Sequence, residues 1–161
     1  MSVELRPVTP EDLATIDRWA LEIGSSEFMS RTRPLAPSAD HHDPASGLFW
    51  YLVISNGLEV GTVWIEHTPQ ENGPILSILL SNHLNFGHGI GTAAVNLALS
   101  EFHRVFPNQT VVLYVRQSNH RAIACYQRVG FTVAGTGSKT SPLGKPITFL
   151  RMVRPQCSPI A

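Results

Sequence analysis

Two short segments of the chain carry residue types that can hold a phosphate and move a proton. The first is Gly87-His88-Gly89-Ile90-Gly91-Thr92, three alternating glycines directly before an Ala-rich stretch. Glycines let a backbone turn sharply, so several N–H groups converge where a helix begins and its dipole favours an anion. The segment contains no Walker lysine, which argues against an NTP-hydrolysing P-loop. We therefore interpret it as a phosphate-binding loop of another kind.

The second segment, residues 119–131, places an asparagine, a tyrosine and a glycine along one predicted helix. Asn119 is a typical helix N-cap, and Gly130 is typical of the position after a helix ends. Tyr126 lies between them, and its phenol can donate a proton while staying neutral at pH 7. Two structural interpretations remain open beside this chemistry, because Tyr126 can be a core aromatic and Asn119 only a cap.

The hydrophobic pattern predicts the elements that must position these residues. Period-two alternation and β-branched runs predict strands, and apolar residues at helical spacing predict helices. The Asn56-Gly57 pair predicts a hairpin turn. A Gly- and Ser-rich loop is expected before the last strand. The predicted strands are 3–8, 48–55, 58–67, 75–80, 111–115, 131–134 and 147–153, and the predicted helices are 10–23, 91–106 and 119–129. This order predicts an α/β sandwich with a mixed sheet.

Composition bounds the function. Hydrophobic residues make up 43% of the 161 residues and the formal net charge is zero, which excludes disorder and argues against a nucleic-acid binder. Cys125 and Cys157 cannot form a disulfide framework. We expect no metal site, because the adjacent His41, His42 and Asp43 have no third ligand at a suitable spacing and read as an exposed loop. Neither a signal peptide nor a membrane span is evident. We expect one soluble, cytoplasmic domain over 1–154 and a flexible tail over 155–161.

Together the two segments resemble the GNAT N-acetyltransferase superfamily. Residues 119–131 match its N-x-x-A-x-x-x-Y-x-[KR]-x-G-F signature, and the glycine loop occupies the place of its [QR]-x-x-G-x-[GA] loop about thirty residues earlier. The opening residues 5–13 also look like the first strand and helix of these enzymes. Within the superfamily, the chain is most similar to the branch of ribosomal-protein, polyamine and aminoglycoside 6′-N-acetyltransferases. The resemblance implies a mostly antiparallel mixed sheet with helices on both faces and splayed strands around a cofactor cleft.

The resemblance also implies an activity: acetyl transfer from acetyl-CoA to a primary amine, by direct attack in a ternary complex. The acceptor would be a small molecule or a protein N-terminus, and relatives often form homodimers. Tyr126 would be the general acid, and an N–H group of residues 78–80 would polarise the thioester carbonyl. The residues that the resemblance places against acetyl-CoA are Ile78, Leu79, Leu80, Phe86, Gly87, His88, Gly89, Ile90, Gly91, Thr92, Asn119, Ala122 and Tyr126. Arg121 and Arg128 lie on the same predicted helix and can meet the phosphates of the cofactor, and a solvated surface role stays equally open for both.

The chain departs from the family pattern in its phosphate loop. Phe86 stands where Gln or Arg is usual, and His88 replaces a Lys or Arg between glycines. Because an imidazole gains its charge in mildly acidic solution, we expect CoA affinity to rise as the pH falls.

The chain also departs from the family pattern at the position of the general base. Residues 74–77 contain no acid where relatives often have Glu. Glu66, beside His67, is the nearest substitute, with Glu71 and His83 more remote. The competing interpretation of Glu66 is a solvated carboxylate at a strand end. We expect three further residues, Met29, Arg31 and Trp50, to line the acceptor pocket, and Cys125 to be a packed, inert thiol.

Two alternatives stay open. The missing acid and altered loop are compatible with a catalytically weak acyl-CoA-binding or sensor domain. Residues 89–94 also fit the G-x-G-x-x-G/A dinucleotide fingerprint, with Arg116 after the next strand suited to a 2′-phosphate, so an NADP-binding protein is the second alternative.

Overall fold

The structure, a computed structural model, describes residues 2–22, 32–36, 38–68, 73–81, 87–141 and 143–155. Several predictions fall outside these ranges. They concern Met29, Arg31, Glu71, His83, Phe86, Cys157 and all of the predicted tail except Pro155.

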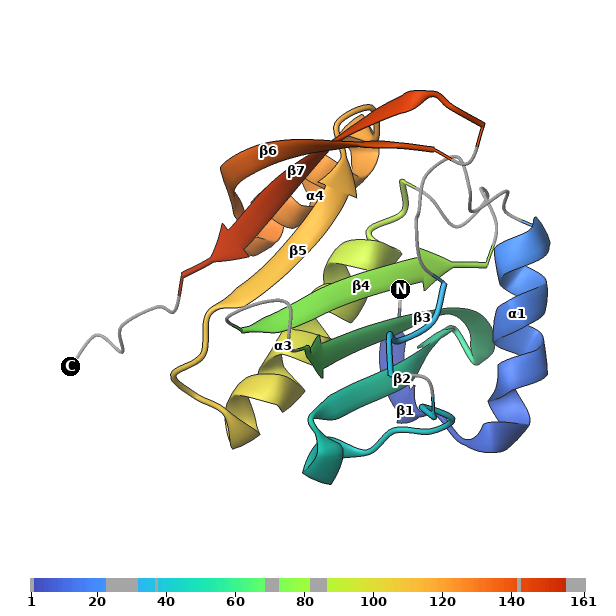
Figure 1. Ribbon diagram of the computed structural model, residues 1–161. Coiled ribbons are helices and arrows are strands. Elements are labelled where there is room, and N and C mark those ends of the chain that lie inside the picture. Colours follow the sequence, from blue (N-terminus) through green and yellow to red (C-terminus); the bar gives the residue numbers. More distant parts are fainter. Residues whose placement is uncertain are drawn as a thin grey trace.

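Seven strands form one sheet in the order β1-β2-β3-β4-β5-β7-β6 (Figure 1). Among these described strands only β4 and β5 pair in parallel, which confirms the mixed, mostly antiparallel sheet. This is not the doubly wound parallel sheet that a dinucleotide fingerprint requires. The strands are β1 (Val3–Pro7), β2 (Leu48–Ser55), β3 (Leu58–His67), β4 (Pro74–Leu80), β5 (Val111–Arg116), β6 (Thr132–Thr140) and β7 (Pro146–Arg154).

Helices cover both faces of the sheet, as predicted. They are α1 (Leu13–Glu22), α3 (Ile90–Val105) and α4 (His120–Val129), with short 3₁₀ turns at Pro10–Asp12 and Pro44–Ser46. None of the helices in the described ranges is both long and apolar enough to cross a membrane.

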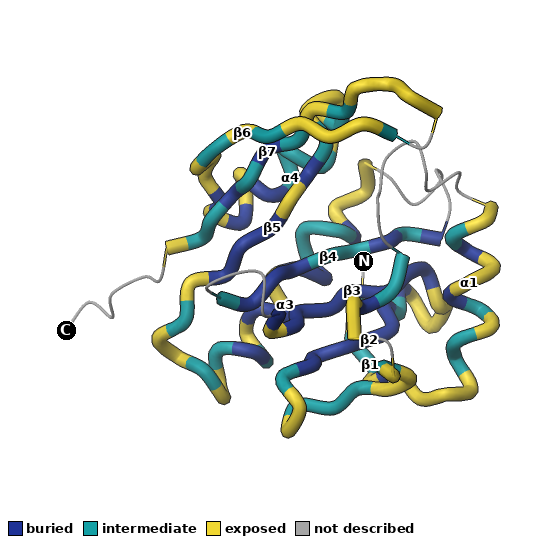
Figure 2. Tube along the Cα trace, in the orientation of Figure 1, coloured by how far each residue is buried: buried dark blue, intermediate teal, exposed yellow. Residues whose placement is uncertain are grey.

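Two hydrophobic clusters, one on each face, hold the helices to the strands. On the face that we call the α3 face, side chains of α3 and α4 pack against alternate residues of β2, β3, β5 and β7. On the opposite α1 face, Ile16 and Trp19 pack against Trp50 and Trp64. Because side chains alternate along a strand, each strand residue belongs to one face or the other. The buried positions concentrate in β2 to β5, whereas β6 is mostly exposed (Figure 2).

The parallel strands β4 and β5 diverge. Their ladder contains a single registered pair, Ile75 with Val112, although β4 continues to Leu80 and stays paired with β3 along its whole length. Beyond Ile75 the two strands therefore leave an opening in the sheet. This is the splay expected around a cofactor cleft.

The prediction for the last hairpin was partly wrong. Residues 135–140, expected to form a Gly- and Ser-rich loop, continue β6, which pairs with β7 as far as Thr140. Gly137 lies under the ring of Phe149, and a Cβ there would come within 2.5 Å of the ring. A glycine in a strand commonly marks such a close approach, and the hydrogen bonds to β7 outweigh the low strand preference of the segment.

Candidate active site

The glycine loop leads into the N-terminus of α3. Gly87 and Gly89 have φ values of 77° and 79°, a left-handed conformation that favours glycine. The Ala93 N–H donates to the Gly89 carbonyl at 3.0 Å, so the N–H groups of residues 90–92 precede the first helical hydrogen bond. Residues 87–89 are exposed, and no atom of the described residues lies within 4 Å of a Cβ built on Gly87. The local geometry is that of an accessible anion site at a helix N-terminus.

Asn119 caps α4, as one interpretation of the sequence predicted. Its side-chain oxygen accepts a hydrogen bond from the Ala122 N–H at 3.3 Å. At the other end Gly130 adopts a φ of 107° and closes the helix by donating to Gln127 and Tyr126 carbonyls. Arg121 and Arg128 are exposed, whereas Ala122 packs against the core of the α3 face.

Tyr126 lies in the core of the α3 face. It is 7% exposed, and its ring contacts that of Phe131 edge-on at a centroid distance of 6.1 Å. Burial raises the pKa of the Tyr126 phenol well above its ordinary value, and neighbouring Cys125 adds to the shift. The phenol is therefore neutral across the physiological range and keeps its proton in the core.

Cys125 points elsewhere, as expected for the neighbour of Tyr126 on a helix. Its Sγ lies 3.3 Å from the Thr92 hydroxyl, and a Cβ on Gly91 would sit 3.6 Å from the sulfur. The thiol is partly buried and helps to join α4 to the first turn of α3.

The β3–β4 register decides which backbone groups of β4 face the opening. The Ser81 N–H donates to the Val60 carbonyl at 2.7 Å, so Ser81 faces β3. Because the backbone N–H groups of successive strand residues point to opposite sides, the Leu79 N–H also points toward β3. The N–H groups of Ile78 and Leu80 point toward the opening. Two of the three predicted residues can thus offer a donor there, and the side chain of Leu79 is buried on the α1 face.

Glu66 is not the solvated strand-end carboxylate that the competing interpretation described. It is 4% exposed, and both of its carboxylate oxygens accept from the Leu35 N–H, at 3.0 and 2.9 Å. In the sheet it pairs with Leu48 on one side and Ile75 on the other. Ile75 is the residue at which β4 and β5 part. The carboxylate therefore lies on the α1 face, near the base of the opening.

Trp50 does not line an open pocket, contrary to the sequence-based expectation. It is fully buried, and its indole N–H donates to the Thr62 hydroxyl at 2.9 Å. The neighbouring Trp64, which the sequence analysis did not single out, is nearer the opening because it pairs with Ser77 of β4. The indole N–H of Trp64 is buried and has no hydrogen-bond partner among the described residues. Only the strand register, not the residue types, reveals this position.

The predicted exposed loop at His41–Asp43 is wrong for His42. The His42 Nδ1 accepts from the Trp50 N–H at 2.9 Å, and its ring lies 4.7 Å from that of Tyr51. No group of three or more potential metal ligands occurs within the described ranges. Burial raises the pKa of Tyr51 to about 12.

A pocket of about 270 Å³ adjoins His42 at the C-terminal end of α3. It is lined by His42, Pro44, Phe49, Tyr51, Glu101, Arg104 and Val105. The glycine loop lies at the opposite end of the same helix, so this pocket is not part of the candidate active site.

We expect the free energy of unfolding to fall in acidic solution because His42 is partly buried. Burial lowers its pKa below the ordinary 6.5, with Asp43 opposing the shift. Well above pH 6.5 the His42 imidazole is neutral in both the folded and the unfolded protein. Below pH 6.5 the unfolded chain binds the proton more readily than the folded protein, so the free energy of unfolding falls as the pH falls. The difference in unfolding free energy between wild type and His42→Gln should therefore shrink between about pH 7.5 and pH 5.5.

His41 provides a control of opposite sign for this prediction. Asp40 raises its pKa, so the stability that His41 contributes is present in acid and lost as the pH rises through its folded value. The difference between wild type and His41→Gln should grow as the pH falls. A pH-independent difference for His42→Gln would contradict the burial argument.

Comparison with known proteins gives concordant results. A family model described as an acetyltransferase (GNAT) domain matches residues 2–132. Mycothiol acetyltransferase of Corynebacterium glutamicum strain R is 35% identical over 91 residues, which are 53% of this chain and 30% of that protein. Peptidyl-lysine N-acetyltransferase YjaB of Salmonella typhimurium is 28% identical over 111 residues, which are 64% of this chain and 72% of that protein.

The fold has close counterparts among solved structures. The structure of AAC(6′)-Ib in complex with paromomycin and acetyl-CoA superimposes with a TM-score of 0.73. The match covers 97% of this chain and 94% of that one, at 24% identity. The chain spans 30% of the length of the mycothiol acetyltransferase that it matches.

Proposed function

The chain belongs to the GNAT acetyltransferase family, and from this premise we propose that it transfers an acetyl group from acetyl-CoA to a primary amine. We assign the activity to residues 1–154, since the sheet ends at Arg154. The observation that carries the proposal is the coincidence of three features: the β4–β5 opening, the glycine loop at α3 and the buried phenol of Tyr126. Each corresponds to a part of the site that the family resemblance implies.

The residues around the loop fit a phosphorylated cofactor. The first-turn N–H groups of α3 supply donors, and no atom of the described residues lies near the position that a Cβ would take at Gly87. Exposed Arg121 and Arg128 on α4 add positive charge on the α3 face. We propose that residues 87–92 hold the pyrophosphate of acetyl-CoA, with Asn119 contributing a hydrogen bond to its pantetheine arm in addition to its role as a cap.

The open edge of β4 supplies the donor for the thioester. The N–H groups of Ile78 and Leu80 face the opening, and either can donate a hydrogen bond to the carbonyl oxygen and stabilise the negative charge that develops on it. A fixed donor at such an oxygen contributes about 3 kcal/mol to a transition state. The amine nitrogen forms a bond to the carbonyl carbon, the carbon–sulfur bond breaks, and Tyr126 donates its phenolic proton to the departing thiolate.

Glu66 is the candidate to accept the proton that the amine must lose. Its burial beside the opening supports this role, and its hydrogen bonds to the Leu35 N–H support a second role in holding residues 32–36. Glu66→Gln keeps an oxygen that can accept from Leu35. It should lower kcat/KM about 10-fold near pH 7, with the loss shrinking in alkaline solution, where the amine is already deprotonated.

The pH profile of kcat/KM separates the two roles of Glu66. An equal loss at every pH would assign Glu66 to loop positioning and remove it from proton transfer. The wild-type enzyme, measured in the same buffers, provides the reference profile.

Thermal unfolding tests the cofactor assignment. Acetyl-CoA at a hundredfold excess over its Kd should stabilise the fold by ~2.7 kcal/mol and raise the midpoint by about 5–10 °C, whereas NADPH should leave it unchanged. A shift with NADPH alone would overturn the proposal. A shift with acetyl-CoA but no turnover with any amine would favour an acyl-CoA-binding domain.

A further inference from the structure

The two halves of the chain carry opposite charge. All twelve Asp and Glu residues lie within residues 1–101, together with four of the twelve Lys and Arg residues. Residues 102–161 contain the other eight Lys and Arg residues and no acid. The boundary falls between β4 and β5, the strands that splay, because β1 to β4 belong to the first half and β5 to β7 to the second. One side of the opening is therefore built from an acidic half and the other from a basic half.

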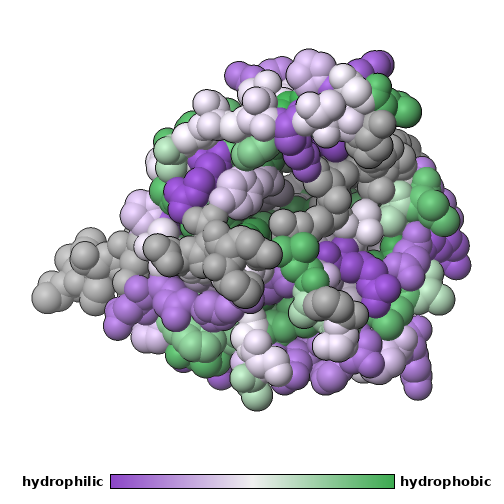
Figure 3. Space-filling model, in the orientation of Figure 1, coloured by the Kyte–Doolittle hydropathy of each residue, from purple (hydrophilic) through white to green (hydrophobic). Residues whose placement is uncertain are grey.

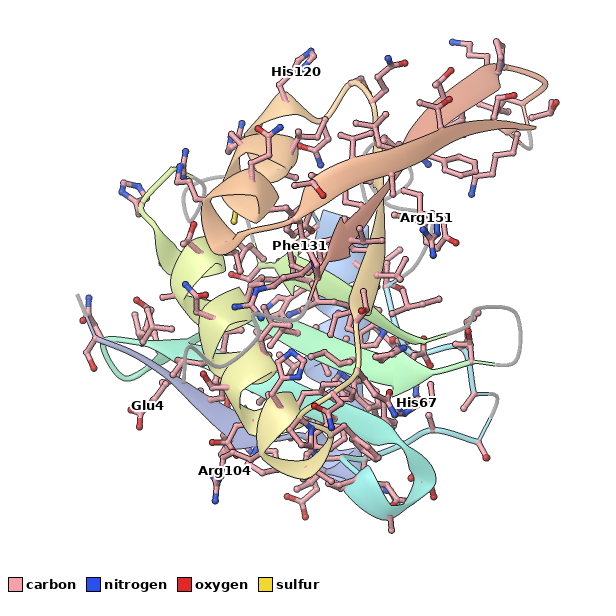
Figure 4. The ribbon with its side chains drawn as sticks, turned by 90° about the vertical axis from the view of Figure 1, so that its left-hand side faces the viewer. Glu4, His67, Arg104, His120, Phe131 and Arg151 are labelled. Carbon is pink, nitrogen blue, oxygen red and sulfur yellow. The ribbon has the colours of Figure 1, made fainter. Side chains whose placement is uncertain are left out.

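Two arginines of the basic half lie on the α1 face. Leu113 and Val115 of β5, and Leu150 and Met152 of β7, pack on the α3 face. The alternate residues consequently face the other way, and they include Arg116 and Arg151. In Figure 4, Arg151 projects from β7 on the side away from α4, whose first residue His120 is labelled. Figure 3 shows that hydrophilic and near-neutral residues predominate over β6 and β7 on the face that it presents.

The register brings the two arginines together beside the opening. Arg116 pairs with Phe149, and Tyr114 pairs with Arg151, so the arginines are diagonal neighbours, a relation that places Cα atoms roughly 7–8 Å apart. Counting on from the pair of Ile75 and Val112, Arg116 lies across the opening from Leu79. Two guanidinium groups at this spacing can both reach one small anion.

These arginines are poorly placed for the phosphates of the cofactor. The glycine loop and the arginines of α4 lie on the α3 face, where we placed acetyl-CoA. An amine that attacks in a ternary complex must then approach from the α1 face. Arg116 and Arg151 therefore belong to the acceptor side, as does the buried carboxylate of Glu66 from the acidic half.

We propose that the acceptor is a primary amine that also carries a carboxylate, and that Arg116 and Arg151 bind this carboxylate. The inference rests on the proposed function and specifies its substrate class. The amino end of such an acceptor faces Glu66 and the acidic half, and the carboxylate faces the basic half. A polycation such as spermidine fits this side less well, because two arginines repel it.

Matched acceptors test the proposal. A panel of amino acids and short aminoalkyl carboxylates is assayed for CoA release, each beside its own carboxamide, together with spermidine and O-phosphoethanolamine. We expect the best carboxylate acceptor to exceed its carboxamide in kcat/KM by about 10- to 100-fold, the range of a charge-assisted hydrogen-bonded pair. A higher kcat/KM for carboxamides or spermidine would overturn the proposal. A preference for O-phosphoethanolamine would overturn the carboxylate assignment.

Variants tie the preference to the two arginines. Arg116→Gln and Arg151→Gln should each lower kcat/KM for the carboxylate acceptor about 10-fold or more and leave the carboxamide nearly unchanged. Arg151→Lys should restore part of the loss because it keeps the charge. Arg104→Gln, the same change at a side chain 74% exposed at the far end of α3, is the matched control and should change neither rate. Equal losses for both acceptors would overturn the proposal.

Stabilisation by acetyl-CoA separates this proposal from the proposed function. Each variant should still be stabilised by acetyl-CoA, which shows that it is folded and binds the cofactor. If amines are acetylated with no preference for those that carry a carboxylate, the proposed substrate class is refuted and the acetyltransferase proposal stands. Absence both of stabilisation by acetyl-CoA and of turnover with any amine refutes the acetyltransferase proposal as well.

Discussion

Tyr126→Phe should lower kcat about 100-fold or more while leaving the Kd of acetyl-CoA nearly unchanged. A positioned proton donor contributes about 10²- to 10⁴-fold to a rate, and this substitution removes only the hydroxyl. The ring should keep its place, because it is 7% exposed and packs edge-on against Phe131. Rapid-quench measurement of acetyl transfer, with calorimetric titration of acetyl-CoA, gives the two quantities separately.

The neighbouring Cys125 provides the control for this experiment. Cys125→Ser changes the adjacent residue, whose sulfur contacts the Thr92 hydroxyl and takes no part in the proposed proton transfer, so it should retain kcat. It also tests for an acyl-enzyme on the thiol, which the ternary-complex proposal excludes. Full activity of Tyr126→Phe would contradict the assignment of Tyr126 as the acid and leave it a core residue.

Gly89→Val should weaken acetyl-CoA binding about 100-fold. Gly89 has a φ of 79° at the N-cap of α3, and a β-branched residue is a strong outlier in that conformation. The backbone must rotate to relieve the strain, and this turns the first N–H groups of α3 away from a shared anion. Losing one or two charge-assisted hydrogen bonds, each contributing about 1.5–3 kcal/mol, accounts for the expected change in Kd.

Gly57→Val controls for backbone strain in this prediction. Gly57 has nearly the same φ, 81°, in the exposed β2–β3 turn, and within the described part of the chain no atom lies within 4 Å of a Cβ there. It should lower the unfolding free energy by about 1–2 kcal/mol without changing the Kd of acetyl-CoA. Equal Kd values for wild type and Gly89→Val would show that residues 87–92 do not hold the cofactor.

Periodicity predicted the order of the elements well. Apolar alternation located β2 and β3, the Asn56-Gly57 turn joined them, and the caps at Asn119 and Gly130 bounded α4. The extension of β6 over residues 135–140 was missed because local composition favours a loop there. Its strand conformation depends on the ladder to β7, a long-range interaction that a local pattern does not contain.

Burial of polar side chains was the least predictable property of the candidate site. Alternation along β3 indicates which face Glu66 occupies, but not that Leu35, thirty-one residues earlier, covers it. The burial of His42 was likewise not predictable from local sequence, because it depends on a hydrogen bond from the backbone N–H of Trp50. By contrast, the glycine loop and the residues of α4 were predictable, because their geometry is set by neighbours in sequence.

The most direct test of the central claim is amine-dependent release of CoA from acetyl-CoA. The purified protein is incubated with acetyl-CoA and primary amines of different classes, and free thiol is measured beside the mass of each amine. We predict that at least one amine accelerates thiol release and gains one acetyl group for each CoA formed. Thiol release that no amine accelerates, in a protein stabilised by acetyl-CoA, would contradict the claim that this chain transfers acetyl groups to amines.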